Sequence, residues 1–239
     1  DVYKRQPELP ATFSVTPDTA ERLAADPMAT STLAQLRTEL GAADRQLLDA
    51  SYVWVSPASL VESGLADELT RQRDLGRSTL RRILEEPLAG TWQLHERVDE
   101  AAMTALRERG IFRSILPGDD LDGDAGARAP VEVPAGGATT TALAAEAPLA
   151  LGFSTPNDPV LAAHRLLANL SVADTSPGDD VAIVTVLPGT TDPASLELVV
   201  DALTVGSAFF EATTVDDALS VASDPEPGVL RPPSLPDLD

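Results

Sequence analysis

The sequence predicts an α/β protein built around a largely parallel sheet. Short β-branched or aromatic runs alternate with longer stretches of helical period, which is typical of successive βα units. No hairpin signal is found between neighbouring strands, so each strand is expected to reach the next through a crossover. A closed barrel and an open doubly wound sheet both fit this pattern. Neither a Gly-x-Gly-x-x-Gly motif nor a P-loop is present, so the sequence lacks the motifs that identify the common nucleotide-binding folds.

Turn residues, caps and apolar periodicity place the elements of the first half. Pro17 opens a helix, Gly41 ends the next one, Gly76 is a candidate kink, and Asp99 is the expected cap of a later helix. In order, we expect a strand at 10–15, helices at 17–26 and 30–40, a strand at 52–55, a largely helical stretch at 56–86, a strand at 91–94, a helix at 99–109, and strands at 111–116 and 131–133.

The second half continues the alternation after an ambiguous stretch at 134–152. We expect helices at 159–170, 193–205 and 215–222 and strands at 181–187 and 209–213.

The two ends of the sequence are not expected to belong to the folded domain. Residues 1–6 resemble a translated sequencing-adaptor fragment and are excluded from the fold. Residues 7–223 are expected to form one barrel-like domain, and residues 224–239, with five prolines among acidic residues, to form a flexible tail or linker.

The charge balance excludes several classes of function. The chain has 239 residues, with 17 Lys and Arg against 38 Asp and Glu, and a formal net charge of −21. Phosphates and anionic lipids would repel such a chain, so no nucleic-acid partner and no membrane contact by this segment are expected. The absence of cysteine removes thiol chemistry, disulfides and cysteine-based metal clusters, and no cofactor is predicted. The longest apolar run, residues 181–187, is far shorter than the roughly 20 residues of a spanning helix.

Three segments in consistent order resemble polysaccharide deacetylases. Residues 10–16, Pro-Ala-Thr-Phe-Ser-Val-Thr, resemble the second-strand motif of that family, and residues 53–60 lie where the family carries its His-x-x-x-His-Pro-x-Leu segment. Residues 96–110 are similar to the stretch after the family's Arg-x-Pro-x-Gly motif. The resemblance implies the distorted seven-stranded (β/α) barrel of glycoside hydrolase/deacetylase type. It also implies that the barrel is incomplete, with the first strand and its acidic motif expected upstream of this sequence.

The sequence departs from the deacetylase pattern at the residues that carry out the family's reaction. Tyr52 and Ser56 stand at the two positions where the family has metal-binding histidines, and this pair is not a plausible ligand set for zinc. Trp92, Leu94 and Glu96 stand at the Arg-x-Pro-x-Gly positions. The resemblance therefore supports the scaffold and argues against the metal-dependent reaction, which favours a domain without catalytic activity and leaves a hydrolase as the alternative.

A second resemblance extends over nearly the full length, to an uncharacterised family of large actinobacterial envelope proteins with a degenerate barrel of this kind. Residues 64–69 with Gly76-Arg77, and residues 157–168, are similar to helices of that family. The composition agrees, since Lys4 is the only lysine and the remaining basic residues are arginines. This resemblance implies a location on the extracellular side of the cell envelope, as part of a longer membrane-anchored protein, with cell-wall glycan or envelope proteins as partners.

Candidate site residues follow the predicted strands. His95 and Glu96 come after a strand and so belong to the rim where barrel enzymes build active sites. They are candidate acid/base groups, as is Asp119, although a loop histidine and solvated carboxylates explain them as well. The candidate binding residues are Tyr52, Ser56, Trp92, His95 and Glu96. Trp54 and Trp92 fit either a sugar-stacking platform or ordinary core packing.

The acidic loop after the strand at 111–116 is a candidate calcium site through Asp120, Asp122 and Asp124. An EF-hand loop counted from Asp120 would need Gly and Glu where the sequence has Ala125 and Val131, so a solvated acidic loop is the default interpretation.

Two main hypotheses of function follow. The first is a non-catalytic barrel domain of a secreted, membrane-anchored envelope protein, with a scaffolding or glycan- or partner-binding role. The second is a carbohydrate-active hydrolase, either a deacetylase or glycosidase-like, whose carboxylates come partly from the upstream strand and partly from Glu96 or Asp119. An open α/β sheet with an unrelated binding role is a third possibility.

Overall fold

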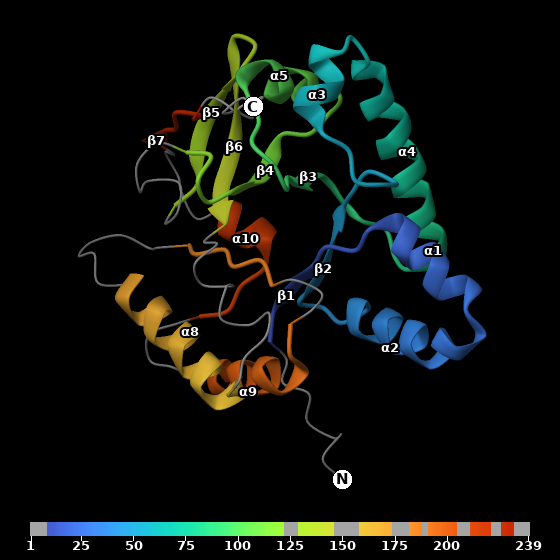
Figure 1. Cartoon of the computed structure of the whole chain (residues 1–239), viewed down its shortest axis with the longest axis vertical. Helices are drawn as coiled ribbons and strands as arrows, with labels where there is room; N and C mark the ends of the chain where they lie inside the picture. The colour runs from blue at the N-terminus through green and yellow to red at the C-terminus, as the bar shows by residue number, and fades with distance from the viewer. Residues whose placement is uncertain are drawn as a thin grey trace, which may run out of the picture.

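The computed structural model describes residues 9–121, 129–145, 158–173, 182–187, 191–204, 211–220 and 226–231. It has an α/β architecture around one seven-stranded sheet in the order β1-β2-β3-β4-β6-β5-β7 (Figure 1). The pairs β1–β2, β2–β3, β3–β4 and β4–β6 are parallel, which confirms the predicted fold class. The sheet is not closed, as expected for an incomplete barrel. The strands are β1 (Ala11–Phe13), β2 (Arg45–Asp49), β3 (Leu88–Gln93), β4 (Arg113–Pro117), β5 (Val131–Ala135), β6 (Ala138–Ala145) and β7 (Glu226–Pro227).

One hairpin interrupts the parallel pattern, contrary to the prediction that neighbouring strands lack one. β5 and β6 pair antiparallel with Ala135 opposite Ala138, and the turn between them is Gly136-Gly137. Both glycines have positive φ, +64° and +78°, which is the backbone of a type I′ turn. The Gly136-Gly137 pair is a sequence signal for a β-hairpin. The prediction was wrong because the stretch 134–152 was left without an assigned secondary structure.

The helices of the first half begin and end largely where their caps predict. The segment 30–40 is helical over its full predicted length, and the Asp99 carboxylate accepts a hydrogen bond of 2.8 Å from the amide of Ala102. The described helices are α1 (Pro17–Ala25), the short 3₁₀ helix η2 (Pro27–Ala29), α2 (Thr30–Leu40), α3 (Pro57–Glu62), α4 (Ala66–Ile83), α5 (Glu100–Glu108), α8 (Pro159–Ala173), α9 (Pro193–Thr204) and α10 (Val215–Ser220).

Three expectations about individual elements were wrong. The strand expected at 52–55 is a loop, and the strand of this region is β2, at residues 45–49. The segment 182–187 makes only an isolated bridge between Val184 and Ala145, and residues 211–213 are not a strand. Phe209 and Phe210 lie outside the described residues. Helix α4 runs without a break through Gly76, which packs closely against the backbone of Ala50 and Tyr52.

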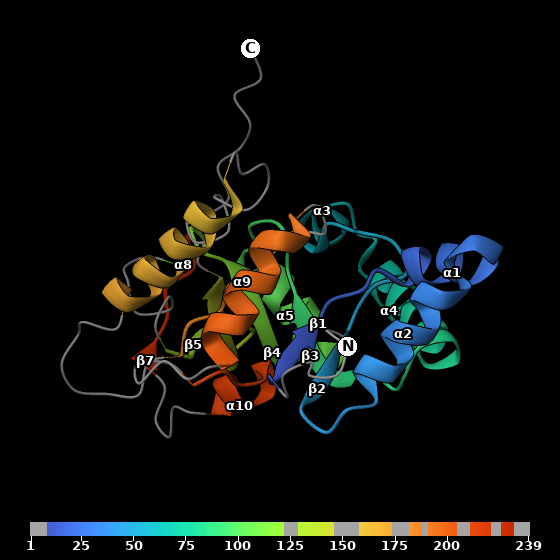
Figure 2. The same ribbon diagram turned by 90° about the horizontal axis from the view of Figure 1, so that it is seen from below.

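The two faces of the sheet are covered by different elements (Figure 2). Leu47 packs with residues of α1, α2 and α4, which lie together on one side. Its neighbour Leu48 faces the other way and packs with Ile115, Leu143 and the segment 182–186 beside α10. Helix α10 is tied to this face, because the amide of Val215 donates to Thr12 of β1 over 2.9 Å.

Candidate functional site

A cavity lies where β1, β2 and β3 end. Because these three strands are parallel neighbours, their carboxyl ends meet at one edge of the sheet, the usual place for a binding site in this class of fold. In Figure 1 the three strands lie side by side, with α4 along their outer side. The cavity is lined by Ser14, Thr16, Asp49, Ala50, Ser51, Trp54, Val55, Pro57, Trp92, Gln93, Leu94 and His95.

The two tryptophans of the chain both line this cavity, in different ways. Trp54 projects from the loop after β2 and is 62% exposed, whereas Trp92 of β3 is only 4% exposed and belongs to the core beside α5. The indole nitrogen Nε1 of Trp92 is buried and has no hydrogen-bond partner among the described residues. The cavity therefore offers an aromatic surface open to solvent at Trp54, next to the buried indole of Trp92.

Asp49 is the acidic group of the cavity, and the sequence analysis missed it. Its side chain is fully buried at the end of β2, where the amide of Ala50 donates to Oδ1 over 3.0 Å. On α4, Arg73 Nε lies 3.3 Å and Arg77 Nη1 4.0 Å from Oδ2. Burial raises the pKa of Asp49 above its ordinary value, and the two arginines offset part of that effect.

His95 and Gln93 complete the polar lining on the β3 side. His95 is exposed, its Nδ1 lies 3.5 Å from Gln93 Nε2, and partial desolvation of the ring lowers its pKa below the ordinary value. The imidazole is therefore neutral at pH 7 and can both donate and accept a hydrogen bond. Of the predicted site residues, the structure brings His95, Trp92 and Trp54 together in this cavity.

Tyr52 and Ser56 are absent from the cavity lining. The hydroxyl of Tyr52 donates to Glu21 Oε2 on α1 over 2.5 Å. Ser56 is the N-cap of α3, where its Oγ accepts from the amide of Ser59 over 3.1 Å. Tyr52 and Ser56 instead hold the chain on either side of Trp54. The deacetylase-like spacing did not indicate this anchoring role.

Asp119 and Asp120, after β4, form a separate acidic group around Arg97, and Glu96 directly precedes Arg97 in the sequence. Arg97 Nη2 lies 2.6 Å from Asp119 Oδ2, and its Nε lies 3.6 Å from Asp120 Oδ1. Asp120 is fully buried, and burial, reinforced by the charge of Asp119, raises its pKa to about 6. The Oε1 atom of Glu96 is buried without a hydrogen-bond partner in the described part of the chain.

The predicted calcium ligands are only partly described. Asp122 and Asp124 lie outside the described residues, so the structure places only Asp120. Within the described ranges, no group of three or more His, Asp or Glu side chains is arranged to hold a metal ion. Across the same ranges, no helix is long and apolar enough to cross a bilayer.

Solved structures with this fold include carbohydrate-active proteins. A 4-α-glucanotransferase from Thermococcus litoralis superposes with a TM-score of 0.69 at 16% identity, over 94% of this chain and 36% of its own length. A provisionally assigned polysaccharide deacetylase from Mycobacterium smegmatis superposes with a TM-score of 0.64 at 18% identity, over 95% of this chain and 77% of its own. This chain thus spans about a third of the glucanotransferase.

These neighbours confirm the predicted fold, an incomplete barrel of glycoside hydrolase/deacetylase type, and at such identities they show the fold alone. No protein-family model and no curated protein matches the sequence. The resemblance to actinobacterial envelope proteins and the adaptor-like character of residues 1–6 stay predictions.

Proposed function

We propose that this chain is a glycan-binding domain whose site is the cavity at the ends of β1, β2 and β3. The observation that carries the proposal is Trp54, a large apolar side chain 62% exposed at the mouth of a cavity that also holds polar groups. An exposed indole is suited to stacking against the apolar face of a sugar ring, with nearby hydrogen-bonding groups fixing its orientation. Gln93 and His95 are such groups.

The role that we propose is recognition rather than turnover. Among the residues that the structure describes, Asp49 is the one Asp or Glu of the cavity lining, and its carboxylate is already held by Arg73 and Arg77. Glycoside hydrolysis of the common kind uses two carboxylates on opposite sides of the bond. We place the domain on the extracellular side of the cell envelope, within a longer membrane-anchored protein, with cell-wall glycan as its partner. The envelope-family resemblance supports this location.

The test is a titration of the purified chain with maltohexaose and, separately, with hexa-N-acetylchitohexaose, followed by tryptophan fluorescence and calorimetry. Saturable binding of at least one oligosaccharide is expected, and Trp54→Ala should weaken it about fivefold or more through loss of stacking. Leu65→Ala is the matched control, because Leu65 is similarly exposed, at 56%, but is absent from the cavity lining. Equal binding by wild type and Trp54→Ala would contradict the proposal.

A second candidate function is a carbohydrate-active hydrolase, and the state of Asp49 is the observation that favours it. A buried carboxyl group with a raised pKa at a strand end is a plausible general acid. Its partner carboxylate would come from outside the cavity lining. Release of acetate or reducing ends from the same two oligosaccharides, abolished in Asp49→Asn, would favour this candidate over the binding domain.

A further inference from the structure

The loop that carries Trp54 is held by two helices, α1 and α4, at Tyr52. Its amide donates to the carbonyl of Gln72 on α4 over 2.9 Å, and its own carbonyl accepts from the amide of Asp18 on α1 over 3.2 Å. Next along the loop, the amide of Val53 donates to Gln72 Oε1 over 3.3 Å. The backbone immediately before Trp54 is therefore attached to both α1 and α4.

The phenol of Tyr52 adds a hydrogen bond to a carboxylate to these backbone contacts. Glu21 accepts from the Tyr52 hydroxyl at Oε2 over 2.5 Å and from Arg82 Nη2 at Oε1 over 2.9 Å. Glu21 lies on α1 and Arg82 on α4, so the carboxylate links the loop and both helices. Tyr52 and Arg82 lower the pKa of Glu21, which keeps the carboxylate ionised and the hydrogen bonds charge-assisted at neutral pH.

The other side of Trp54 is fixed at Ser56. Ser56 caps α3 through the amide of Ser59, and Pro57 occupies the first turn of the helix. Only three residues, 53–55, separate Tyr52 from Ser56. Between two such close anchors the backbone of Trp54 has less conformational freedom left to lose on binding, which favours an effective stacking surface.

We infer that Tyr52 is a positioning residue for Trp54: through Glu21 and Arg82 it holds the 53–55 segment so that the indole forms a fixed wall of the cavity. The positioning of Trp54 is inferred from the contacts above. Its effect on ligand affinity rests on the proposed glycan-binding function. Tyr52 thus has a mechanical role at the position where the deacetylase-like spacing would put a metal-binding histidine.

The experiment uses the full chain labelled with 5-fluorotryptophan, which gives one ¹⁹F signal for each of the two tryptophans. Tyr52→Phe and Glu21→Ala are expected to shift or broaden the Trp54 signal while leaving the Trp92 signal in place. They should also weaken binding of the better oligosaccharide by about threefold. Glu21→Gln keeps an acceptor for the phenol and should restore much of the wild-type signal. Arg71→Gln is the matched control, because it removes an exposed ion pair with Glu68 on the same helix.

The outcomes separate the two proposals. If Trp54→Ala abolishes binding but Tyr52→Phe leaves the Trp54 signal and the affinity unchanged, the positioning role is overturned and the glycan site stands. If the Trp54 signal responds to Tyr52→Phe but Trp54→Ala binds as wild type, the positioning role stands and the glycan site does not. If Tyr52→Phe or Glu21→Ala fails to fold, Arg82→Gln takes its place in the comparison, because it removes the other hydrogen bond to the Glu21 carboxylate.

Discussion

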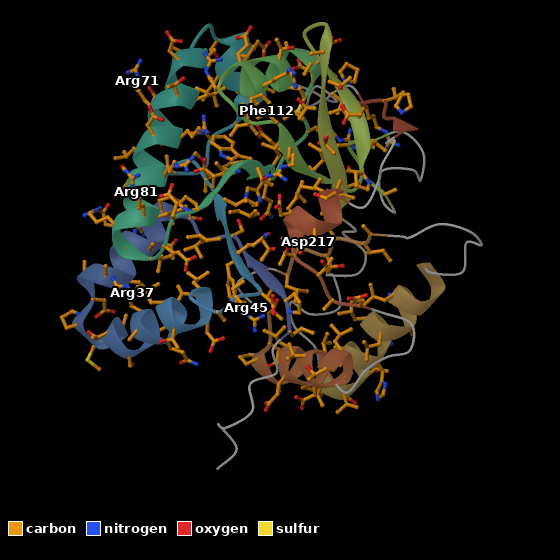
Figure 3. The ribbon with its side chains drawn as sticks, turned by 180° about the vertical axis from the view of Figure 1, so that it is seen from behind. Arg37, Arg45, Arg71, Arg81, Phe112 and Asp217 are labelled. Atoms are coloured by element: carbon orange, nitrogen blue, oxygen red, sulfur yellow. The ribbon has the colours of Figure 1, made fainter. Side chains whose placement is uncertain are left out.

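Arg73 on α4 links Asp49 at the end of β2 to the backbone of Arg109 at the end of α5. Its Nε lies 3.3 Å from Asp49 Oδ2, and its Nη1 donates to the Arg109 carbonyl. Arg73 and Asp49 are 19% and 0% exposed, so the pair lies largely out of water, unlike the pairs of Arg71 and Arg81, which project from the outer side of α4 (Figure 3). The cavity carboxylate is thus held in place by a helix on the outside of the sheet.

Arg73→Leu should destabilise the fold by about 2–4 kcal/mol, because removing one partner of a buried pair leaves the other charge uncompensated. Arg77 at 4.0 Å moderates the loss. The measurement is chemical denaturation at pH 7. Arg71→Leu, which removes the pair of an arginine 74% exposed, should cost less than about 1 kcal/mol, and an equal effect of the two variants would contradict this account.

Gly76→Ala should destabilise the protein, although alanine normally favours a helix interior over glycine by about 1 kcal/mol. A Cβ at position 76 would lie 2.1 Å from the carbonyl oxygen of Ala50 and 2.9 Å from the amide nitrogen of Tyr52. Helix α4 or the Trp54 loop must then move, and we expect a net loss of about 2 kcal/mol or more. Thermal unfolding measures the loss, and oligosaccharide titration should show weaker binding.

The control for that variant is Gly41→Ala. Gly41 has φ of −73°, and a Cβ there would meet only the carbonyl oxygens of Arg37, at 3.4 Å, and Thr38, at 3.7 Å. We expect a change within about 0.5 kcal/mol. If Gly76→Ala were as mild as Gly41→Ala, the close approach of α4 to the loop would not be a real constraint on the fold.

Asp120 should make the protein more stable as the pH falls from 7 towards 4. Its pKa is about 6 in the folded chain, above the ordinary 3.8, so between these values the folded state binds more protons than the unfolded state. The stabilisation amounts to at most about 3 kcal/mol and is lost as the pH rises through 6. Urea denaturation across this range should show the trend in the wild type and a flatter profile in Asp120→Asn.

The pKa of the neighbouring carboxylate, Asp119, is shifted in the opposite direction. Arg97 holds the pKa of Asp119 below its ordinary value, so Asp119 contributes stability that is lost only when the pH falls below about 4. Asp119→Asn also removes a charge that helps raise the pKa of Asp120, so it should flatten the profile between pH 5 and 7 in part, and less than Asp120→Asn does, because burial is the larger cause. A profile of Asp120→Asn as steep as that of the wild type would place the titrating group elsewhere.

The elements that sequence reasoning predicted well are those whose ends are determined locally. Helix α2 starts and stops as its residues predict, and Asp99 caps α5, because caps and turn residues act over a few positions. The expected strand at 52–55 was wrong for the complementary reason. Tyr52, Trp54 and two valines favour a strand by composition, but here tertiary contacts with α1 and α4 hold them as a loop.

The candidate site was less predictable than the fold. Asp49, Trp92 and His95 come from separate parts of the chain and meet only because β2 and β3 end at the same edge. His95 was accessible to reasoning from its place after a strand. Asp49 was not, because placing the strand at 52–55 rather than at 45–49 hid the fact that this residue lies at a strand end.

The charge of the cavity predicts a preference for uncharged over anionic glycans. The described part of the chain contributes no Lys or Arg to its lining, Arg73 and Arg77 are engaged by Asp49, and the full sequence carries a formal charge of −21. An oligosaccharide with several carboxylates would be repelled without gaining a cationic partner, and salt would screen that repulsion. Maltohexaose should therefore bind more tightly than hexagalacturonate at 20 mM salt, with the difference shrinking at 500 mM. Tighter binding of hexagalacturonate at low salt would show that the ligand is recognised outside this cavity.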